Sequence, residues 1–91
     1  MGKIKRLRSL VQHGLYYLTE HAYNEAMEDG FDIFDVEYAI LGGKMRRSWP
    51  REKKYEIVGL TPDGRPLGVI CRITAGQKVR IITAYEDRQK Q

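Results

Sequence analysis

The chain has 91 residues, of which 42% are hydrophobic and 31% charged, and this composition is typical of one small folded domain. It disfavours large cofactor-binding enzymes, since a dinucleotide-binding fold needs more chain, and no apolar run approaches the ~20 residues of a membrane-spanning helix. The first residues lack the apolar stretch of a secretory signal, so we expect a cytoplasmic protein. A single cysteine, Cys71, excludes an internal disulfide and a cysteine-cluster zinc site.

The formal net charge of +4 is distributed unevenly along the chain. Residues 1–11 carry +4, residues 12–43 carry −7, residues 44–54 carry +5 and residues 55–91 carry +2. Basic segments around an acidic one favour a polyanion such as nucleic acid on one face of the molecule. The same separation of charge also suits contact with an acidic protein. The charge pattern alone leaves both partners open.

The first predicted element is a short basic amphipathic helix over 3–12, with Ile4, Leu7 and Val11 at helical spacing. It ends before Gly14, and residues 1–14 are predicted to form a basic N-terminal helix or arm. Such a segment either binds nucleic acid or a membrane surface, or simply packs at the terminus. A compact β-favourable stretch over 15–18 then predicts one short strand.

Two helices are predicted next, each with its own capping residues. Thr19 is placed to cap a helix over 20–29, and Gly30 can take the left-handed conformation that ends it. Asp32 opens the second helix, with Asp35 in the capping-box position, and the glycine pair at 42–43 stops it. The residues of the second helix expected at the core are Ile33, Val36, Ala39 and Ile40, widened by Phe34, Tyr38 and Leu41.

After residue 43 the apolar period becomes that of strands. Strands are predicted over 44–49, 55–60, 67–73 and 78–85, with turns at 61–64 and 75–77. The expected fold is α+β, of order β-α-α-β-β-β-β, with two consecutive helices packed on an antiparallel sheet over 15–86 and a loose tail over 87–91. The uncovered face of this sheet is left for solvent or a ligand.

Alternation along the last two strands predicts which side chains share a face. The core face is expected to carry Val69, Cys71, Ile73, Val79, Ile81, Thr83 and Tyr85. A three-residue loop at 75–77 then sets Arg72 directly across from Arg80 on the other face. Like charges so opposed repel, and an anion between them removes the conflict. Alternatively both arginines extend into water and cover apolar surface with their stems.

The two histidines and the cysteine give weaker indications of function. His21 could transfer a proton near neutral pH, although a lone helical histidine is more often a capping or packing residue. His13 is expected at a helix end, and the two histidines lack metal-ligand spacing. Cys71 falls in a buried strand, which predicts an inert core thiol. We therefore expect neither a metal nor a cofactor.

Six short segments resemble a small bacterial family of unassigned function. They are Thr19-Glu20-His21-Ala22, Gly30-Phe31, Asp35-Val36, Tyr55-Glu56-Ile57-Val58-Gly59, Asp63-Gly64-Arg65-Pro66-Leu67 and Arg80-Ile81-Ile82-Thr83-Ala84-Tyr85. The resemblance covers about 19–86. That family is similar to the BrnT and RelE groups of toxins, whose sheet binds RNA and which cut messenger RNA, often on the ribosome. An antitoxin protein covers the basic surface of these relatives.

The resemblance implies a RelE-like fold and a metal-free endoribonuclease. Its matching positions here are His21, Arg65, Arg80 and Tyr85. Arg65 and Arg80 would neutralise the phosphate, His21 would transfer a proton and Tyr85 would stack on a base. Further RNA contacts are expected from the basic residues of the strand half, which are Lys44, Arg46, Arg47, Lys53, Lys54 and Arg72. The expected partners are RNA or ribosome-bound mRNA and an antitoxin.

Two acidic residues depart from the pattern of that family. Glu25 and Asp29 stand where the relatives carry arginines, and carboxylates there would repel an RNA backbone. The alternative from a different functional class is therefore a catalytically silent protein–protein interaction module on the same fold, as a homodimer or a subunit of a complex. A DNA-binding regulator is disfavoured because the helix over 33–41 is acidic.

Overall fold

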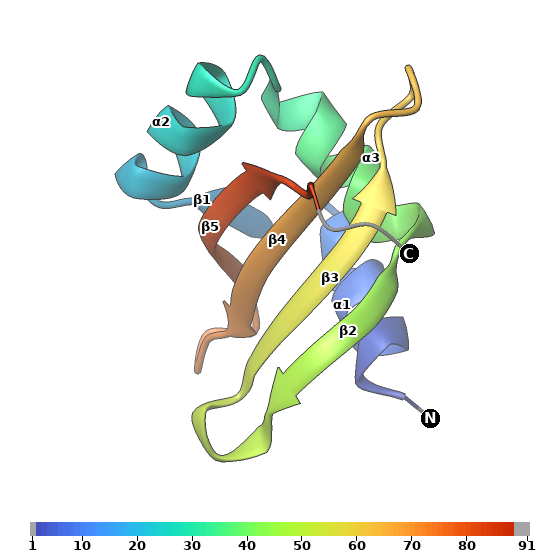
Figure 1. Cartoon of the computed structure of the whole chain (residues 1–91). Coiled ribbons are helices and arrows are strands. Elements are labelled where there is room, and N and C mark those ends of the chain that lie inside the picture. Colours follow the sequence, from blue (N-terminus) through green and yellow to red (C-terminus); the bar gives the residue numbers. More distant parts are fainter. Residues whose placement is uncertain (1, 89–91) are drawn as a thin grey trace.

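The computed structural model describes residues 2–88, which form three helices and one five-stranded sheet in two layers (Figure 1). In chain order the elements are α1 (Lys3–Gln12), β1 (Tyr16–Leu18), α2 (Glu20–Glu28), α3 (Ile33–Gly42), β2 (Lys44–Trp49), the short 3-10 helix η1 (Pro50–Glu52), β3 (Lys54–Leu60), β4 (Pro66–Ile73) and β5 (Val79–Glu86). The predicted α+β class is confirmed. Among the described residues, no helix has the length and apolar character needed to cross a bilayer.

The predicted capping residues start and stop the helices as expected. The Thr19 hydroxyl accepts a hydrogen bond from the Ala22 N–H at 3.1 Å. Asp32 and Asp35 form the reciprocal capping box, with distances of 2.9 and 3.0 Å. Gly30 follows α2 with a φ of +82°, a conformation that favours glycine. Local sequence therefore sets the limits of both helices.

The sheet has the order β1-β5-β4-β3-β2 and is mixed, which corrects the prediction of a purely antiparallel sheet. Strand β1 pairs in parallel with β5, while the other three pairs of neighbours are antiparallel. Hairpin-type turns force antiparallel pairing, whereas β1 and β5 are joined through most of the chain. The long connection leaves the direction of β1 free to be parallel.

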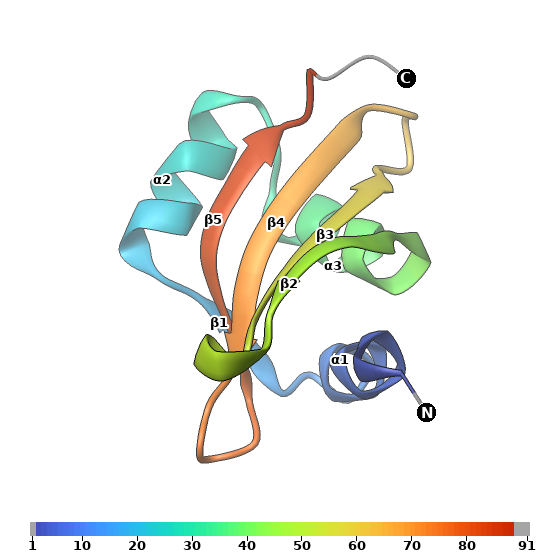
Figure 2. The same cartoon turned by 60° about the horizontal axis from the view of Figure 1, so that its bottom comes forward.

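All three helices cover the same face of the sheet, and the other face is open (Figure 1 and Figure 2). The core between the two layers includes residues of α1, because Leu7, Leu10 and Val11 are buried. The N-terminal segment is therefore a packed helix with an exposed basic side, the second of the two alternatives.

The apolar stripe of α3 is narrower than predicted. Val36, Ala39 and Ile40 are buried, but Ile33 is 39% exposed and Phe34 is 71% exposed. Near Ala39 the helix approaches β3 closely, since a Cβ atom at Gly59 would overlap the carbonyl oxygen of Ala39.

A β-bulge in β5 moves Tyr85 to the open face and corrects the predicted alternation. Ile70 pairs with Thr83 and Cys71 pairs with Ile81, so one residue of β5 has no partner on β4. One extra residue reverses the facing of every side chain beyond it. Ala84 is therefore buried at the core, where Thr83 and Tyr85 were expected.

Candidate nucleic-acid interface

One row of residues crosses all five strands on the open face. The backbone pairing joins Trp49 to Lys54, Lys54 to Arg72, Arg72 to Arg80, and Arg80 to Tyr17. At a strand spacing of ~4.8 Å, this cationic row is about 19 Å long. It places three cations between two aromatic residues, one at each edge of the sheet.

The burial of neighbouring residues establishes that the row faces away from the helices. Tyr55 and Cys71 are buried at the core, so the adjacent Lys54 and Arg72 point to the opposite face. The Tyr16 hydroxyl reaches the Glu37 carboxylate of α3 at 2.8 Å, so the adjacent Tyr17 also lies on the open face. Tyr17 is 43% exposed.

The two central arginines are opposed across β4 and β5 as the loop length predicted. The Thr74 N–H donates to the Lys78 carbonyl at 2.8 Å, which closes the hairpin and fixes the pairing of Arg72 with Arg80. Both arginines are exposed, and within residues 2–88 neither forms an ion pair. No carboxylate of the described residues therefore offsets the repulsion between these two arginines.

The row meets aromatic surface at the edge formed by β2. Lys54 Nζ lies 5.1 Å from the centre of the Trp49 ring, and the Arg47 guanidinium lies 5.5 Å from it. Lys54 also forms an ion pair with Glu52 at 3.2 Å, and the Glu52 side chain is 60% exposed. Cations beside a partly exposed indole make a surface beside which a nucleic-acid base can stack.

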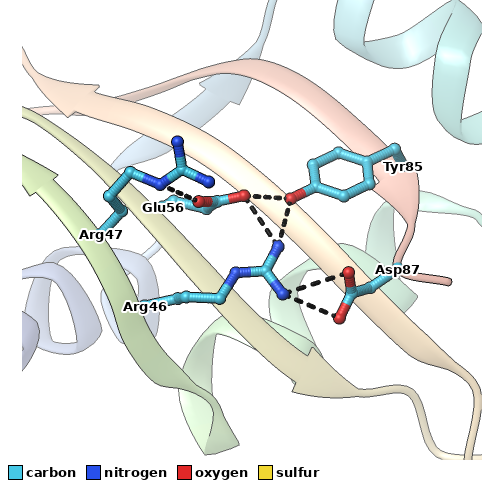
Figure 3. A network of polar contacts seen from close by, with 5 residues as sticks. All are labelled: Arg46, Arg47, Glu56, Tyr85 and Asp87. Atoms are coloured by element: carbon cyan, nitrogen blue, oxygen red, sulfur yellow. Dashed lines mark hydrogen bonds and ion pairs between the residues drawn. The ribbon is translucent and has the colours of Figure 1, made fainter. Parts of the chain in front are cut away.

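A second group of polar residues, the Glu56 network, lies beside the row on the same face (Figure 3). Arg46 Nη2 donates to Glu56 Oε2 and to the Tyr85 hydroxyl, each at 2.9 Å, and Arg46 Nη1 donates to Asp87 at 3.1 and 3.2 Å. The Tyr85 hydroxyl donates to Glu56, and Arg47 Nε lies 3.2 Å from the second Glu56 oxygen.

Asp87 is buried, which corrects the prediction that the chain is loose from residue 87 onward; residues 89–91 lie outside the described part.

The electrostatics of this network keep its carboxylate charged. Burial acts to raise the pKa of Glu56, but hydrogen bonds from Arg46 and Tyr85 outweigh it and hold the pKa below the ordinary value. Burial and the Glu56 carboxylate raise the pKa of Tyr85 to about 12. The Glu56 carboxylate is thus neutralised by cations, and Arg46, Arg47 and Tyr85 are all engaged in contacts with it. A phosphate would have to compete with Glu56 for them.

The ring of Tyr85 reaches Glu56 by crossing over a glycine. A Cβ atom at Gly68 would lie 2.5 Å from the Tyr85 Oη and 2.6 Å from its Cε2. Only a residue without a side chain leaves this space to the ring. Tyr85, which was predicted to stack on a base, therefore packs over β4.

Arg65 stabilises the end of α2 and lies away from the row. Its Nη2 donates to the Asp29 carbonyl at 2.6 Å, and its guanidinium lies 4.2 Å from the centre of the Phe31 ring. Arg65 also donates to the Gly30 carbonyl at 3.4 Å and forms an ion pair with Glu86 at 3.6 Å. Arg65 directly precedes β4 and Arg72 lies near the other end of that strand, about 23 Å away along an extended chain.

The structure does not bring the four predicted catalytic positions together. His21 lies on α2 with its side chain 68% exposed, and its Nε2 is 3.3 Å from Glu25. Arg65 caps α2, Tyr85 belongs to the Glu56 network, and Arg80 lies in the cationic row. Of the other predicted RNA contacts, Lys54 and Arg72 join Arg80 in the row, while Lys44 and Lys53 are exposed outside it.

The two acidic residues that depart from the relatives have a structural role that the sequence analysis missed. Glu25 accepts a hydrogen bond from the Ala84 N–H at 3.2 Å, and Asp29 accepts one from the Glu86 N–H at 2.9 Å. Strand β1 pairs only with the first part of β5, so the carboxylates of Glu25 and Asp29 cover the remaining edge of β5. Glu25 and Asp29 lie on the same side of α2 as the buried Ala22, and this spacing in the sequence could have indicated that they face the sheet.

The cysteine and the acidic residues offer no metal-binding group within the described residues. Nowhere in residues 2–88 do three or more His, Cys, Asp or Glu side chains gather in a way that could hold a metal ion. Cys71 is fully buried, and burial raises the pKa of its thiol to about 12. The predicted burial of this cysteine is confirmed.

The chain was compared with known proteins at the level of families, curated sequences and solved structures. No curated protein and no solved structure matches it. One family model, described as a domain of unknown function (DUF4258), matches residues 18–86, nearly the same stretch that carries the resemblance to a family of unassigned function. The chain belongs to this DUF4258 family.

Proposed function

We propose that this protein binds single-stranded RNA across the open face of its sheet, with the cationic row as the binding site. The observation that carries the proposal is the direct opposition of Arg72 and Arg80 on an open surface, with no carboxylate paired to either of them in residues 2–88. A phosphate backbone laid along the row would relieve this repulsion.

The composition of the row favours a single strand. Arginine donates to phosphate in a fork, and Trp49 and Tyr17 at the two edges offer rings on which unpaired bases can stack. An open sheet face with aromatic and basic residues suits splayed bases better than a duplex groove. The resemblance to the BrnT and RelE toxins adds support for RNA, including ribosome-bound mRNA, and for an acidic antitoxin that covers the same row.

The proposal concerns binding and does not extend to cleavage. Endonuclease chemistry without a metal needs a base, an acid and cations around one phosphate. His21 lies on the helix side of the molecule and Arg65 lies at the end of β4 away from Arg72, so neither stands beside Arg80.

Removal of one central arginine is expected to weaken RNA binding about tenfold, because each supplies a charge-assisted hydrogen bond to phosphate. Fluorescence anisotropy with a labelled single-stranded RNA, at several salt concentrations, would compare Arg72→Ala and Arg80→Ala with the wild type. The salt dependence of log K should become shallower by about one phosphate in each variant.

Arg88→Ala is the matched control, since it removes the same charge from an exposed arginine outside the row. It should change RNA affinity by less than a factor of about two or three. Equal losses in all three variants would mean that only net charge matters, and undetectable binding by the wild type would end the proposal.

A further inference from the structure

A basic cleft of about 500 Å³ lies where three segments distant in sequence meet. They are the start of α1, the η1 turn between β2 and β3, and the β4–β5 hairpin, all at the same end of the sheet (Figure 1 and Figure 2). The basic residues that line it are Lys3, Arg6, Arg51, Lys53 and Arg72. Its size is within the usual range of small-molecule sites.

The fold holds the basic side chains of α1 at this place. Leu7 and Val11 fix the helix to the core, which leaves Lys3 and Arg6, three residues apart, on its exposed side. Tyr55 and Ile73 line the cleft from the core face of the sheet. The cleft is therefore built on packed elements, and it shares one residue, Arg72, with the cationic row of the open face.

The positive charge of the cleft is poorly compensated. Its one carboxylate, Glu52, forms an ion pair with Lys54 of the cationic row at 3.2 Å. Within the described part of the chain, Lys3, Arg6, Arg51 and Lys53 are all exposed and none forms an ion pair. Bringing like charges together in this way costs free energy, which a bound anion would recover.

The backbone around the cleft has an independent peculiarity. In residues 2–88, two residues other than glycine have positive φ angles, Lys53 at 52° and Gln77 at 63°. Both line the cleft. Residues other than glycine adopt this conformation at a cost, and such positions concentrate at ligand sites and clamps. Lys53 ends η1 and Gln77 lies in the β4–β5 hairpin, so two residues with this costly conformation come from different hairpins and line one cleft.

We propose that the cleft binds a group of consecutive phosphates. One phosphate group carries a charge of only about −1.5 to −2, which leaves most of five cations uncompensated. A chain of two or three linked phosphates matches the positive charge of the lining better. Such a chain occurs in a free nucleotide or polyphosphate and at the 5′ end of a triphosphorylated RNA, and both offer the same chemistry to the cleft.

Isothermal titration calorimetry with tripolyphosphate tests the cleft without involving RNA. We expect one binding site per chain in the wild type, and an affinity on the order of tenfold lower in Arg6→Ala and in Arg51→Ala. Lys5→Ala is the matched control on the same helix, because Lys5 is exposed but does not line the cleft. It should change the affinity less than twofold, and Arg80→Ala should leave it unchanged.

The source of the phosphates is resolved by comparing RNA of one sequence with a 5′-triphosphate or a 5′-hydroxyl end. Tighter binding of the triphosphate form that disappears in Arg6→Ala assigns the cleft to an RNA end. Equal binding of both RNAs, together with tripolyphosphate binding, assigns it to a free nucleotide or polyphosphate. Absence of tripolyphosphate binding, or an equal loss in Lys5→Ala, overturns the proposal while leaving RNA binding on the open face untouched.

Discussion

Replacement of Arg46 by methionine is expected to lower the free energy of unfolding by about 3–5 kcal/mol. The guanidinium of Arg46 bonds two carboxylates whose side chains are only 6% and 4% exposed, those of Glu56 and Asp87. Methionine keeps the length of the stem but leaves both charges buried without their main cation. Urea denaturation followed by circular dichroism would measure the loss.

Two further variants test whether the loss of stability comes from buried carboxylates that are left without a cation. Arg47 also contacts Glu56, but its side chain is 59% exposed, so Arg47→Met should cost no more than about 1 kcal/mol. Combining Arg46→Met with Glu56→Gln and Asp87→Asn removes the buried charges and should restore part of the stability. If Arg46→Met and Arg47→Met were equally mild, the network would contribute little to folding.

Replacement of Gly59 by alanine is expected to lower the free energy of unfolding by about 3 kcal/mol, because α3 must move away from β3. The new Cβ would overlap the carbonyl oxygen of Ala39 and lie 2.9 Å from its carbonyl carbon and 3.0 Å from the Cα of Gly43. These are backbone atoms, which cannot rotate out of the way as a side chain could. Thermal and urea unfolding would measure the change.

Gly42→Ala provides the control for this prediction, since it makes the same substitution in the last residue of α3. Nothing lies within 4 Å of a Cβ atom at Gly42, and alanine favours the helix. The stability of this variant should be unchanged or raised by up to about 1 kcal/mol. A Gly59→Ala protein as stable as Gly42→Ala would mean that α3 is not held as close to β3 as described.

Features set by neighbouring residues were predictable from the sequence. The capping box of Asp32 and Asp35 needs only two residues at a fixed spacing, and both hydrogen bonds form. The pairing of Arg72 with Arg80 follows from the length of one loop, which limits the ways in which two strands can align. Two of the five residues of the cationic row were therefore paired correctly from the sequence alone.

Features set by distant parts of the chain were not predictable in the same way. The bulge that turns Tyr85 to the open face adds one residue without changing the apolar character of the strand. The alternation of apolar residues along β5 therefore does not indicate where the bulge lies. The place of β1 beside β5 brings Tyr17 into the row, and only the assembled sheet shows this. The resemblance gave Arg65 a role on RNA, whereas the carbonyl groups that it bonds, those of Asp29 and Gly30, lie at the end of α2, far from Arg65 in the sequence.

The fluorescence of Trp49 tests RNA binding on the open face most directly, because it is the only tryptophan in the chain and stands at one end of the cationic row. Titration with single-stranded RNA should quench its emission in a saturable, salt-sensitive way, because a base stacks on or near the ring. The quenching should weaken strongly when Arg72 and Arg80 are both replaced by alanine. RNA binding detected by anisotropy with no change at Trp49 would place the RNA elsewhere on the molecule.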